Sequence, residues 1–377
     1  MMRISLILAL LLLLPRGACG KGPGDGGLYK VAITRDVPPE AFVYNWRDAV
    51  LMKSLIDIWR TDESRRHEIE AYIQSAMIRV APKAHGRHPN GLAAGVGLAF
   101  LKEARLSTDV TDAALARVHS HYLEITRTPE GGCSHRPGRL ELWDDTLYML
   151  DIFLIECYRA SGELAYVGEL ADEVLAHAKH LCDPASGLWY HGWSATNVPG
   201  DDACSQSGWN ANPGQRNSEF WGRGNGWVAM AMADLLEFLP REDPRYPGVK
   251  DIFVQMMATL SRLQDKSTGL WYQLPSRPGE TGNFLESSCS AMFGYAAEKG
   301  FQTGVLPRRY HKVALRALRG LRKRIVSPGT AEAFLDGVCA GTCIGDKEYY
   351  YARKRVAGSG ETYATGVFLM LENLLNQ

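Results

Sequence analysis

The sequence predicts an all-α protein with the architecture of an (α/α)6 barrel, in which six helical hairpins form two concentric rings. Strand-like patterns are scarce, whereas helical periodicity recurs from residue 41 to the C-terminus. Apolar helices alternate with amphipathic ones, as expected when an inner ring is buried inside an outer ring. Long loops alternate with short ones, so parallel inner helices would gather the long loops at one rim and form a funnel there.

Eleven helical segments are predicted, and a twelfth would have to be short or displaced. In chain order they lie near residues 41–60, 66–80, 92–105, 110–127, 144–161, 164–181, 223–239, 246–264, 284–299, 307–324 and 360–376. Gly, Ala and large apolar residues assign five of them to the inner ring: 92–105, 144–161, 223–239, 284–299 and 360–376. Charged faces assign three to the outer ring: 66–80, 110–127 and 307–324.

The loops that enter the apolar helices are long and rich in aromatic and polar residues: 128–143, 182–221, 265–283 and 325–359. Two of these loops contain a repeated sequence pattern, and each copy precedes an inner helix. The copies are Asp183-Pro-Ala-Ser-Gly-Leu-Trp-Tyr190 and Asp265-Lys-Ser-Thr-Gly-Leu-Trp-Tyr272. No linker divides the chain. Residues 21–377 are therefore predicted to form one domain.

The N-terminus and the charge balance bear on where the protein works. Residues 1–20 combine Arg3, a short apolar run and Ala18-Cys19-Gly20, a pattern typical of a secretory signal, so we expect a secreted, extracellular protein. Lys+Arg and Asp+Glu both total 42, which gives no reason to expect nucleic acid or a membrane as partner. One basic block, Arg316 to Arg324, is interpreted as the solvated face of a helix. The sequence predicts no oligomeric state.

The cysteines and histidines predict no metal site and no cofactor. Seven of the eight cysteines follow the signal segment, so at least one should stay a free thiol. Cys339 and Cys343, in a Gly-rich loop, are the pair expected to form a disulfide. No Cys/His spacing resembles a zinc site, and His177 and His180 are expected on the surface.

The segment Phe220-Trp221-Gly222-Arg223-Gly224-Asn225-Gly226-Trp227 opens an apolar helix and has the composition of a binding site. Free N–H groups and the helix dipole favour an anionic ligand at such an end. Trp221 and Trp227 can stack on sugar rings, and Arg223 can recognise a carboxylate. The alternative is a Gly-rich turn whose tryptophans only fill the core.

Asp144 and Asp145 begin another apolar helix, where adjacent side chains project about 100° apart, so at most one can face the funnel. Apolar neighbours favour Asp145, because desolvation would raise its pKa and suit it to donate a proton. Alternatively, both residues only complement the helix dipole. His135, His191 and Tyr44 fall on the same rim and are further candidates for the site.

These motifs, together with later ones, resemble the unsaturated rhamnogalacturonyl hydrolases of glycoside hydrolase family 105. The segments that carry the resemblance are Trp143-x-Asp145-Thr-Leu-Tyr-Met149, His191-Gly-Trp193, Phe220 to Trp227, Glu286-Ser-Ser-Cys-Ser-Ala-Met-Phe293, Cys339 to Asp346 and Tyr350-x-x-Arg353. The resemblance implies an (α/α)6 barrel that removes a 4,5-unsaturated uronic acid from oligosaccharides left by polysaccharide lyases. It implies Asp145 as the general acid/base, with a sugar subsite lined by Tyr44, His135, His191, Trp221, Arg223 and Trp227.

The chain departs from the family pattern at one position. The family commonly has an Asp at the entry to the third helix, where this chain has His88-Pro89-Asn90-Gly91, which places Asn90 in the subsite. An Asn keeps hydrogen bonds but lacks the charge, which affects either substrate preference or activity. Two alternatives therefore stay open. One is a conventional inverting glycosidase with Glu286 as second carboxylate. The other is a carbohydrate-binding protein without catalysis.

Overall fold

The structure, a computed structural model, describes residues 24–195, 215–353 and 361–377. Its inner helices pack side by side into a closed ring, as the sequence predicts. In ring order they are α2 (Trp46–Thr61), the pair α4 (Pro89–Ala93) and α5 (Val96–Glu103), α7 (Asp145–Ser161), α9 (Gly222–Phe238), α11 (Ser287–Gln302) and α14 (Thr362–Leu375), which returns to α2. Nearly all of their residues are buried.

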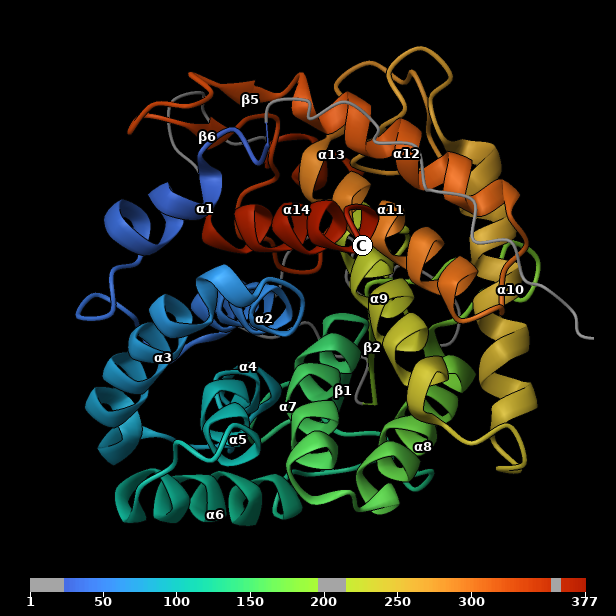
Figure 1. The fold of residues 1–377 in the computed structure, drawn as a ribbon. Coiled ribbons are helices and arrows are strands. Elements are labelled where there is room, and N and C mark those ends of the chain that lie inside the picture. The colour runs from blue at the N-terminus through green and yellow to red at the C-terminus, as the bar shows by residue number, and fades with distance from the viewer. Residues whose placement is uncertain (1–23, 196–214, 354–360) are drawn as a thin grey trace, which may run out of the picture.

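The outer helices lie at the edge of the ring (Figure 1). They are α3 (Arg66–Val80), α6 (Asp109–Leu123), α8 (Leu164–Leu181), α10 (Tyr246–Leu263) and α12 (Arg309–Arg322). The short or displaced twelfth helix is α1 (Leu28–Val31), continued by a π-helical turn η1 (Ala32–Asp36), and both pack against α14. Short helical turns also occur as η2 (Glu63–Arg65), η3 (Ala81–Lys83) and α13 (Lys347–Tyr351).

Two helix starts differ from the prediction for local reasons. The helix predicted from residue 41 begins at Trp46, because the Asn45 side chain accepts hydrogen bonds from the N–H groups of Arg47 and Asp48 and so caps it. The helix predicted from residue 92 is broken in two. His88 caps α4 by accepting the Gly91 N–H through Nδ1, and α5 begins after Gly95.

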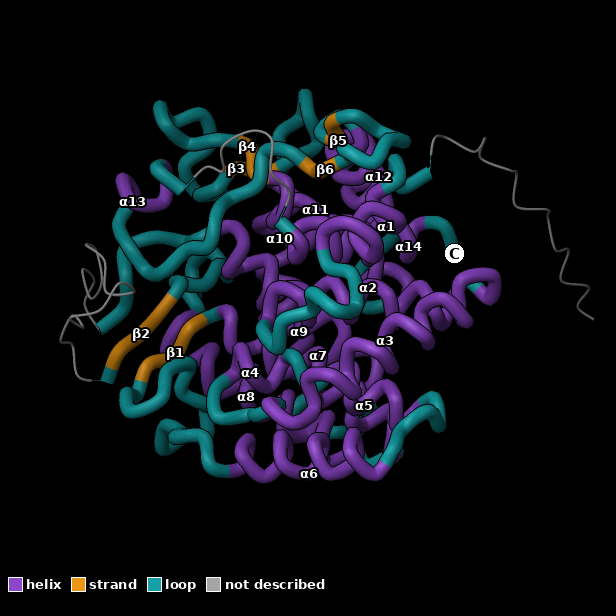
Figure 2. Tube along the Cα trace, turned by 90° about the vertical axis from the view of Figure 1, so that its left-hand side faces the viewer, coloured by secondary structure: helices purple, strands orange, loops and turns teal. Residues whose placement is uncertain are grey.

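Three short antiparallel ribbons lie in the long loops: β1 (Glu141–Trp143) with β2 (Gly192–Ser194), β3 (Trp271–Tyr272) with β4 (Leu285–Glu286), and β5 (Ile325–Val326) with β6 (Phe334–Leu335). The first two ribbons and α13 lie together on the left-hand side of Figure 2. Strands β1 and β4 each lead directly into an inner helix, so the ribbons fix the ends of the long loops above the helix N-termini.

Two predictions from cysteine and histidine spacing are wrong. Cys339 is a buried free thiol, which contacts Gln273 and Thr342 in the interior, whereas Cys343 is disulfide-bonded to a different cysteine. His177 is fully buried beside Glu173, because it lies on the face of α8 that packs inward, and His180 is half-buried. Among the described residues, no helix combines the length and the apolar character needed to cross a membrane.

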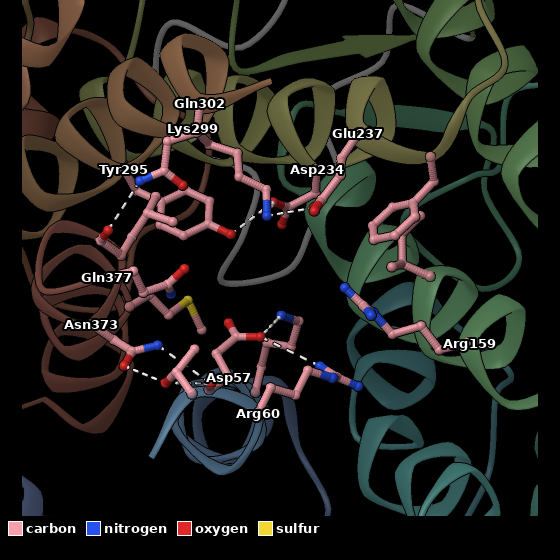
Figure 3. Close-up of a pocket in the computed structure, with 16 residues that line it drawn as sticks. Asp57, Arg60, Arg159, Asp234, Glu237, Tyr295, Lys299, Gln302, Asn373 and Gln377 are labelled. Atoms are coloured by element: carbon pink, nitrogen blue, oxygen red, sulfur yellow. Dashed lines mark hydrogen bonds and ion pairs between the residues drawn. The ribbon is translucent and has the colours of Figure 1, made fainter. Parts of the chain in front are cut away.

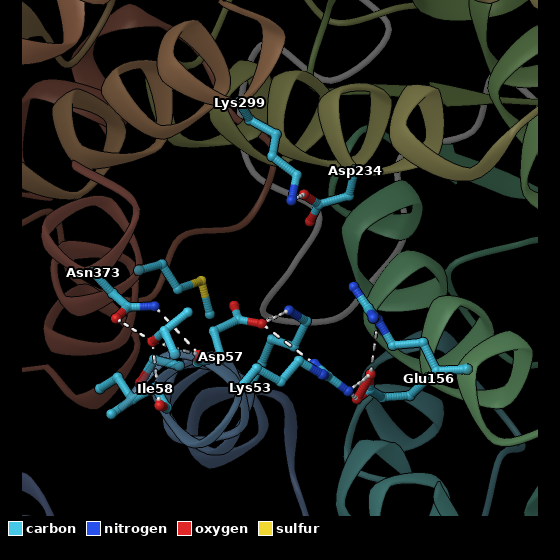
Figure 4. A network of polar contacts seen from close by, with 12 residues as sticks. Lys53, Asp57, Ile58, Glu156, Asp234, Lys299 and Asn373 are labelled. Atoms are coloured by element: carbon cyan, nitrogen blue, oxygen red, sulfur yellow. Dashed lines mark hydrogen bonds and ion pairs between the residues drawn. The ribbon is translucent and has the colours of Figure 1, made fainter. Parts of the chain in front are cut away.

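The end of the barrel opposite the long loops contains a cavity of about 200 Å³ lined by charged side chains (Figure 3). Lys53 pairs with Asp57 (Nζ to Oδ1, 2.6 Å), and Arg60 pairs with the fully buried Glu156 (Nη2 to Oε1, 2.6 Å) (Figure 4). Tyr295 donates to Asp234 across the same space (2.7 Å). Buried charges are tolerated only when paired, so this network closes the rear of the barrel with compensated charge.

Asp151 of α7 is fully buried near this network, and neither of its carboxylate oxygens has a hydrogen-bond partner among the described residues. Burial, reinforced by the charge of Asp234, raises its pKa well above the usual 3.8, against the opposing effect of Lys53 and Lys299. At pH values between the usual 3.8 and the raised pKa of Asp151 in the folded protein, the folded protein binds more protons than the unfolded chain. The free energy of unfolding therefore falls as pH rises through this range.

We expect Asp151→Asn to remove this pH-dependent loss, because the amide is neutral at every pH. The melting temperature of the variant should exceed that of the wild type at about pH 8, and the difference should shrink toward about pH 4. Thermal melts across this range measure it. A decrease in melting temperature that is the same at every pH would show instead that the carboxyl group makes an essential interaction.

Candidate active site

The N-terminal ends of the inner helices bring most of the predicted site residues to one rim. Asp145 is the first residue of α7, and its side chain is 18% exposed. The β1–β2 pairing sets Trp143 opposite Gly192, and the Asp144 N–H donates to the His191 carbonyl (2.9 Å). This ribbon therefore brings His191 to Asp145, although the two residues are far apart in the sequence.

Asp145, His191 and Tyr350 form one hydrogen-bonded chain. His191 Nε2 lies 3.0 Å from Asp145 Oδ2, and His191 Nδ1 lies 2.8 Å from the Tyr350 hydroxyl. The imidazole is fully buried and stacks on Trp221, with ring centroids 4.3 Å apart. Burial lowers the pKa of His191 and raises that of Tyr350, so a neutral imidazole accepts from the tyrosine and donates Nε2–H to Asp145.

The predicted rise in the pKa of Asp145 is wrong for the free protein. Burial alone would raise it, but the hydrogen bond from His191, together with the positive charge of Arg223, holds the pKa of Asp145 below its usual value. Sequence patterns could not show this, because the compensating groups come from the loop before β2 and from the start of α9. Asp145 is therefore a carboxylate near neutral pH until a ligand changes its surroundings.

Asp144 is the member of the acidic pair whose pKa is raised. It is fully buried, and neither carboxylate oxygen has a hydrogen-bond partner among the described residues. Burial, followed by the charge of Asp145, raises the pKa of Asp144 well above its usual value. Its carboxyl group lies against Gly224, where a Cβ atom would fall 2.1 Å from Oδ2. Glycine at this position makes room for the acid.

Asp144, Asp145 and His191 also have the right atoms for a metal ion, since one ligand atom from each lies within 4.8 Å of the others. The same His191 nitrogen is engaged by Asp145 in the hydrogen-bonded chain. That no metal is needed stays a prediction, and chelation tests it below.

Asn90 of α4 lies beside His135, with 3.4 Å between Asn90 Nδ2 and His135 Nε2. His135 Nδ1 lies 2.9 Å from the Thr146 hydroxyl, and the ring stacks on Trp143 with centroids 4.6 Å apart. Burial lowers the pKa of His135 to about 4. A neutral His135 can accept from the Asn90 amide at Nε2 and donate from Nδ1 to Thr146, so uncharged Asn90 suits an uncharged histidine.

Arg223 is 1% exposed and lies between two aromatic rings, with its Cζ atom 4.5 Å from the centroid of Trp221 and 4.7 Å from that of Tyr363. Its Nη1 donates to the Cys339 carbonyl (2.8 Å), and its Nη2 donates to the Ala340 carbonyl (3.0 Å). The guanidinium thus anchors the loop around Cys339, a contact that sequence reasoning missed. The buried Nε–H has no partner among the described residues.

The aromatic candidates lie at different depths. Tyr44 and Trp221 are at the rim, and the buried Tyr44 hydroxyl and Trp221 Nε1 have no hydrogen-bond partner among the described residues. Trp227 is fully buried and stacks on Tyr148, with centroids 4.9 Å apart, so it also serves as core. Its Nε1 is likewise unpartnered. Buried donors normally find acceptors, so these groups are the natural partners of ligand oxygens.

Glu286, the alternative second carboxylate, is fully buried and saturated with hydrogen bonds. Its oxygens accept from the N–H groups of Ser288 (3.0 Å), Cys289 (2.6 Å) and Cys339 (2.9 Å), and also from the Ser288 hydroxyl. The residue caps α11 and ties it to the loop around Cys339. Tyr350 and Thr146, by contrast, are site residues for which no role was predicted, although both lie inside motifs that carried the resemblance.

Comparison with known proteins places this geometry among carbohydrate-active enzymes. The sequence model of Glycosyl Hydrolase Family 88 matches residues 31–373. Unsaturated rhamnogalacturonyl hydrolase YesR of Bacillus subtilis is 25% identical over 339 residues, covering 86% of this chain and 88% of that protein. The expected resemblance to such hydrolases is thereby confirmed.

Solved structures share the fold. A family 105 glycoside hydrolase from C. acetobutylicum superposes with a TM-score of 0.78 at 22% identity, covering 93% of this chain and 99% of that one. An unsaturated glucuronyl hydrolase from a Bacillus species superposes with a TM-score of 0.63 at 16% identity, covering 93% of this chain and 94% of that one. The predicted six-hairpin barrel is confirmed.

Proposed function

Because the chain belongs to Glycosyl Hydrolase Family 88 and is a glycoside hydrolase, we propose that it removes a 4,5-unsaturated uronic acid from the non-reducing end of lyase-generated oligosaccharides of the pectin or rhamnogalacturonan type. The observation that carries the proposal is the partly exposed carboxylate of Asp145, held by His191 at the rim. The name of the Bacillus subtilis relative supports the same substrate class.

One carboxyl group suffices for this reaction because an unsaturated uronide is a vinyl ether. The Asp145 acid gives its proton to C4, and the ring oxygen stabilises the positive charge that develops at C5. Water then adds to C5 while the Asp145 carboxylate takes the proton that the water loses. The resulting hemiketal opens to a ketone at C5 and a hemiacetal at C1, which releases the remaining sugar as an alcohol.

Asp145 must gain a proton before it can act, and the substrate supplies a reason. The uronate carboxylate brings a like charge into a buried site, which raises the pKa of a neighbouring carboxyl group. Arg223 Nε–H and the donors of Tyr44, Trp221 and Trp227 are the groups that we assign to the bound sugar. The raised pKa of Asp144 favours its neutral form beside Asp145, which limits the negative charge in the site.

A conventional inverting mechanism needs a second free carboxylate to activate water. Glu286 is the alternative for this second carboxylate. Its oxygens already accept hydrogen bonds from three backbone N–H groups, which leaves Glu286 no role as a base. The other alternative, a binding protein without catalysis, was suggested by Asn90 in place of the charged residue common in the family, but the match to a hydrolase family over residues 31–373 does not support it.

A panel of lyase-generated oligosaccharides, followed by the ultraviolet absorbance of the C4=C5 bond, tests the proposal. We expect the absorbance to decay on at least one uronide from a pectic backbone, at the same rate before and after dialysis against a chelator. No decay on any member of the panel would favour the binding protein. A rate that chelation abolishes would assign a metal to Asp144, Asp145 and His191.

We expect Asn90→Asp to raise the pKa of His135 by about one unit or more, because a carboxylate at this position favours the charged imidazole. At pH values where His135 stays neutral, the added charge should also move the limb of the pH–rate profile on which Asp145 ionises to higher pH. NMR titration of His135 and the pH dependence of kcat/KM measure the two effects. If both stay unchanged, Asn90 is only part of the entry to α4.

Secretion is a separate proposal, based on the N-terminal segment alone. We propose that residues 1–20 direct export and are removed, which makes the mature protein extracellular. N-terminal sequencing of protein recovered from the medium should then begin near Lys21. Recovery of the chain only inside cells, starting at Met1, would contradict it.

A further inference from the structure

A groove of about 370 Å³ on the outside of the barrel lies between α12 and the loop that follows α10. The described residues that line it include five cations and no acidic residue: Lys266, Arg316, Arg319, Arg322 and Lys323, beside Ser267, Thr268, Gly269 and Gly320. This is the basic block that the sequence analysis interpreted as a solvated helix face. The proposed reaction does not use it.

The groove is rigid because loop and helix backbones touch. A Cβ atom at Gly320 would lie 2.3 Å from the Thr268 carbonyl oxygen, and one at Gly269 would lie 2.4 Å from that of Arg316, so both positions require glycine. Gly269 also has φ +79°, which favours glycine. Gln264 completes the junction by donating to the carbonyls of Gly269 and Val313.

The charge of the groove is compensated only in part: Arg322 pairs with Glu372 (Nη2 to Oε1, 2.8 Å) and Arg316 donates to the Gln264 side chain, which leaves three of the five lining cations. Residues 304–324 contain eight Lys or Arg and no Asp or Glu, in a chain whose basic and acidic residues total 42 each. Lys266, Arg319 and Lys323 are exposed, and none of them forms an ion pair with another described residue. The carboxylate of neighbouring Asp265 is occupied by Ser267 and Thr268.

We propose that this groove binds a polyuronate chain and holds it beside the funnel. The proposal rests on the proposed function for the choice of an acidic glycan. The C-terminal half of α12 lines the groove, and the loop at Lys266 leads into β3, which pairs with Glu286, the residue that caps α11, so the groove lies on the side of the long loops. A polymer held there raises the local concentration of chain ends near Asp145.

The spacing of the cations favours a polyuronate over nucleic acid. Arg316, Arg319 and Lys323 follow one helix face at intervals of three and four residues, which is about 5 Å along the axis per charge. Duplex DNA carries one charge per about 1.7 Å, whereas a polyuronate carries one per sugar. A membrane surface is less suited, because α12 packs its apolar face against α11 and has none to insert.

The test compares two triple charge reversals in the full-length protein. The groove variant combines Lys266→Glu, Arg319→Glu and Lys323→Glu and reverses three charges of the groove. The control variant combines Lys83→Glu, Arg241→Glu and Lys250→Glu and reverses three charges at exposed positions elsewhere. Calorimetry with polygalacturonate should show binding weakened about tenfold or more in the groove variant and nearly wild-type binding in the control, at low salt where surface charges are least screened.

Activity on an unsaturated disaccharide separates this proposal from the proposed function. Both triple variants should hydrolyse the disaccharide at the wild-type rate, because the groove is outside the catalytic site. If no variant hydrolyses it but the binding difference persists, the proposed function fails and the groove stands. Equal polygalacturonate binding by both triple variants, or wild-type binding of duplex DNA or phosphatidylserine vesicles as tight as that of polygalacturonate, would overturn the groove proposal.

Discussion

Asp145→Asn is expected to lower kcat by at least about a hundredfold, the lower range for a positioned general acid/base, while folding and substrate binding stay close to wild type. The amide has nearly the same shape and can still meet His191, but it has no proton to give to C4. Initial rates from the decay of the double-bond absorbance measure the loss.

The folding control for this variant is its melting temperature, which should lie close to that of the wild type. Substrate binding is followed by calorimetry on the inactive protein. A variant that retains more than about a tenth of the wild-type rate would remove Asp145 from the role of acid, given the size of effect that such groups produce.

Gly224→Ala is expected to lower kcat/KM by about tenfold or more, because the new methyl group would overlap the Asp144 carboxyl group at 2.1 Å and overpacking of this kind costs about 1–3 kcal/mol. Relief requires the start of α7 to move, and with it the 3.0 Å contact between Asp145 and His191. Steady-state kinetics and thermal melts measure the two effects.

Gly226→Ala is the matched control, two residues further along the same helix. Its methyl group would meet Met292, with the sulfur at 2.5 Å and Cβ at 2.9 Å, so this substitution also requires a shift, but of α11 and not of the start of α7. Its activity should stay near wild type. If both substitutions lower kcat/KM by the same factor, the effect comes from helix α9 as a whole, and the contact between Gly224 and Asp144 has no special role.

The ring of helices could be predicted because its pattern is local. Apolar and amphipathic segments alternate along the chain, and each can be recognised within a short window of sequence. The twelfth helix escaped prediction because only four α-helical residues, Leu28–Val31, precede a π-helical turn. The start of α4 at Pro89 also escaped, since a histidine cap is not among the usual N-terminal signals.

The site was predictable in composition but not in electrostatics. Motifs placed Asp145, His191 and Trp221 at one rim, and the structure brings these three together. The pKa of Asp145 depends on a hydrogen bond from another loop, and the contacts of Arg223 depend on Cys339, 116 positions away. Spacing within a motif carries no information about such long-range partners, so the low pKa and the anchored guanidinium emerge only from the folded chain.

The central claim, protonation of the double bond by Asp145, is tested most directly with a matched pair of unsaturated uronides that differ only in an oxygen or a sulfur atom at the glycosidic link. Hydration acts on C4=C5 and leaves the linking atom untouched until the ring has opened. The account therefore predicts that the double-bond absorbance decays at comparable rates for both compounds, and for neither with Asp145→Asn. Decay with the oxygen-linked compound alone would contradict it, because only a conventional glycosidase must protonate the linking atom.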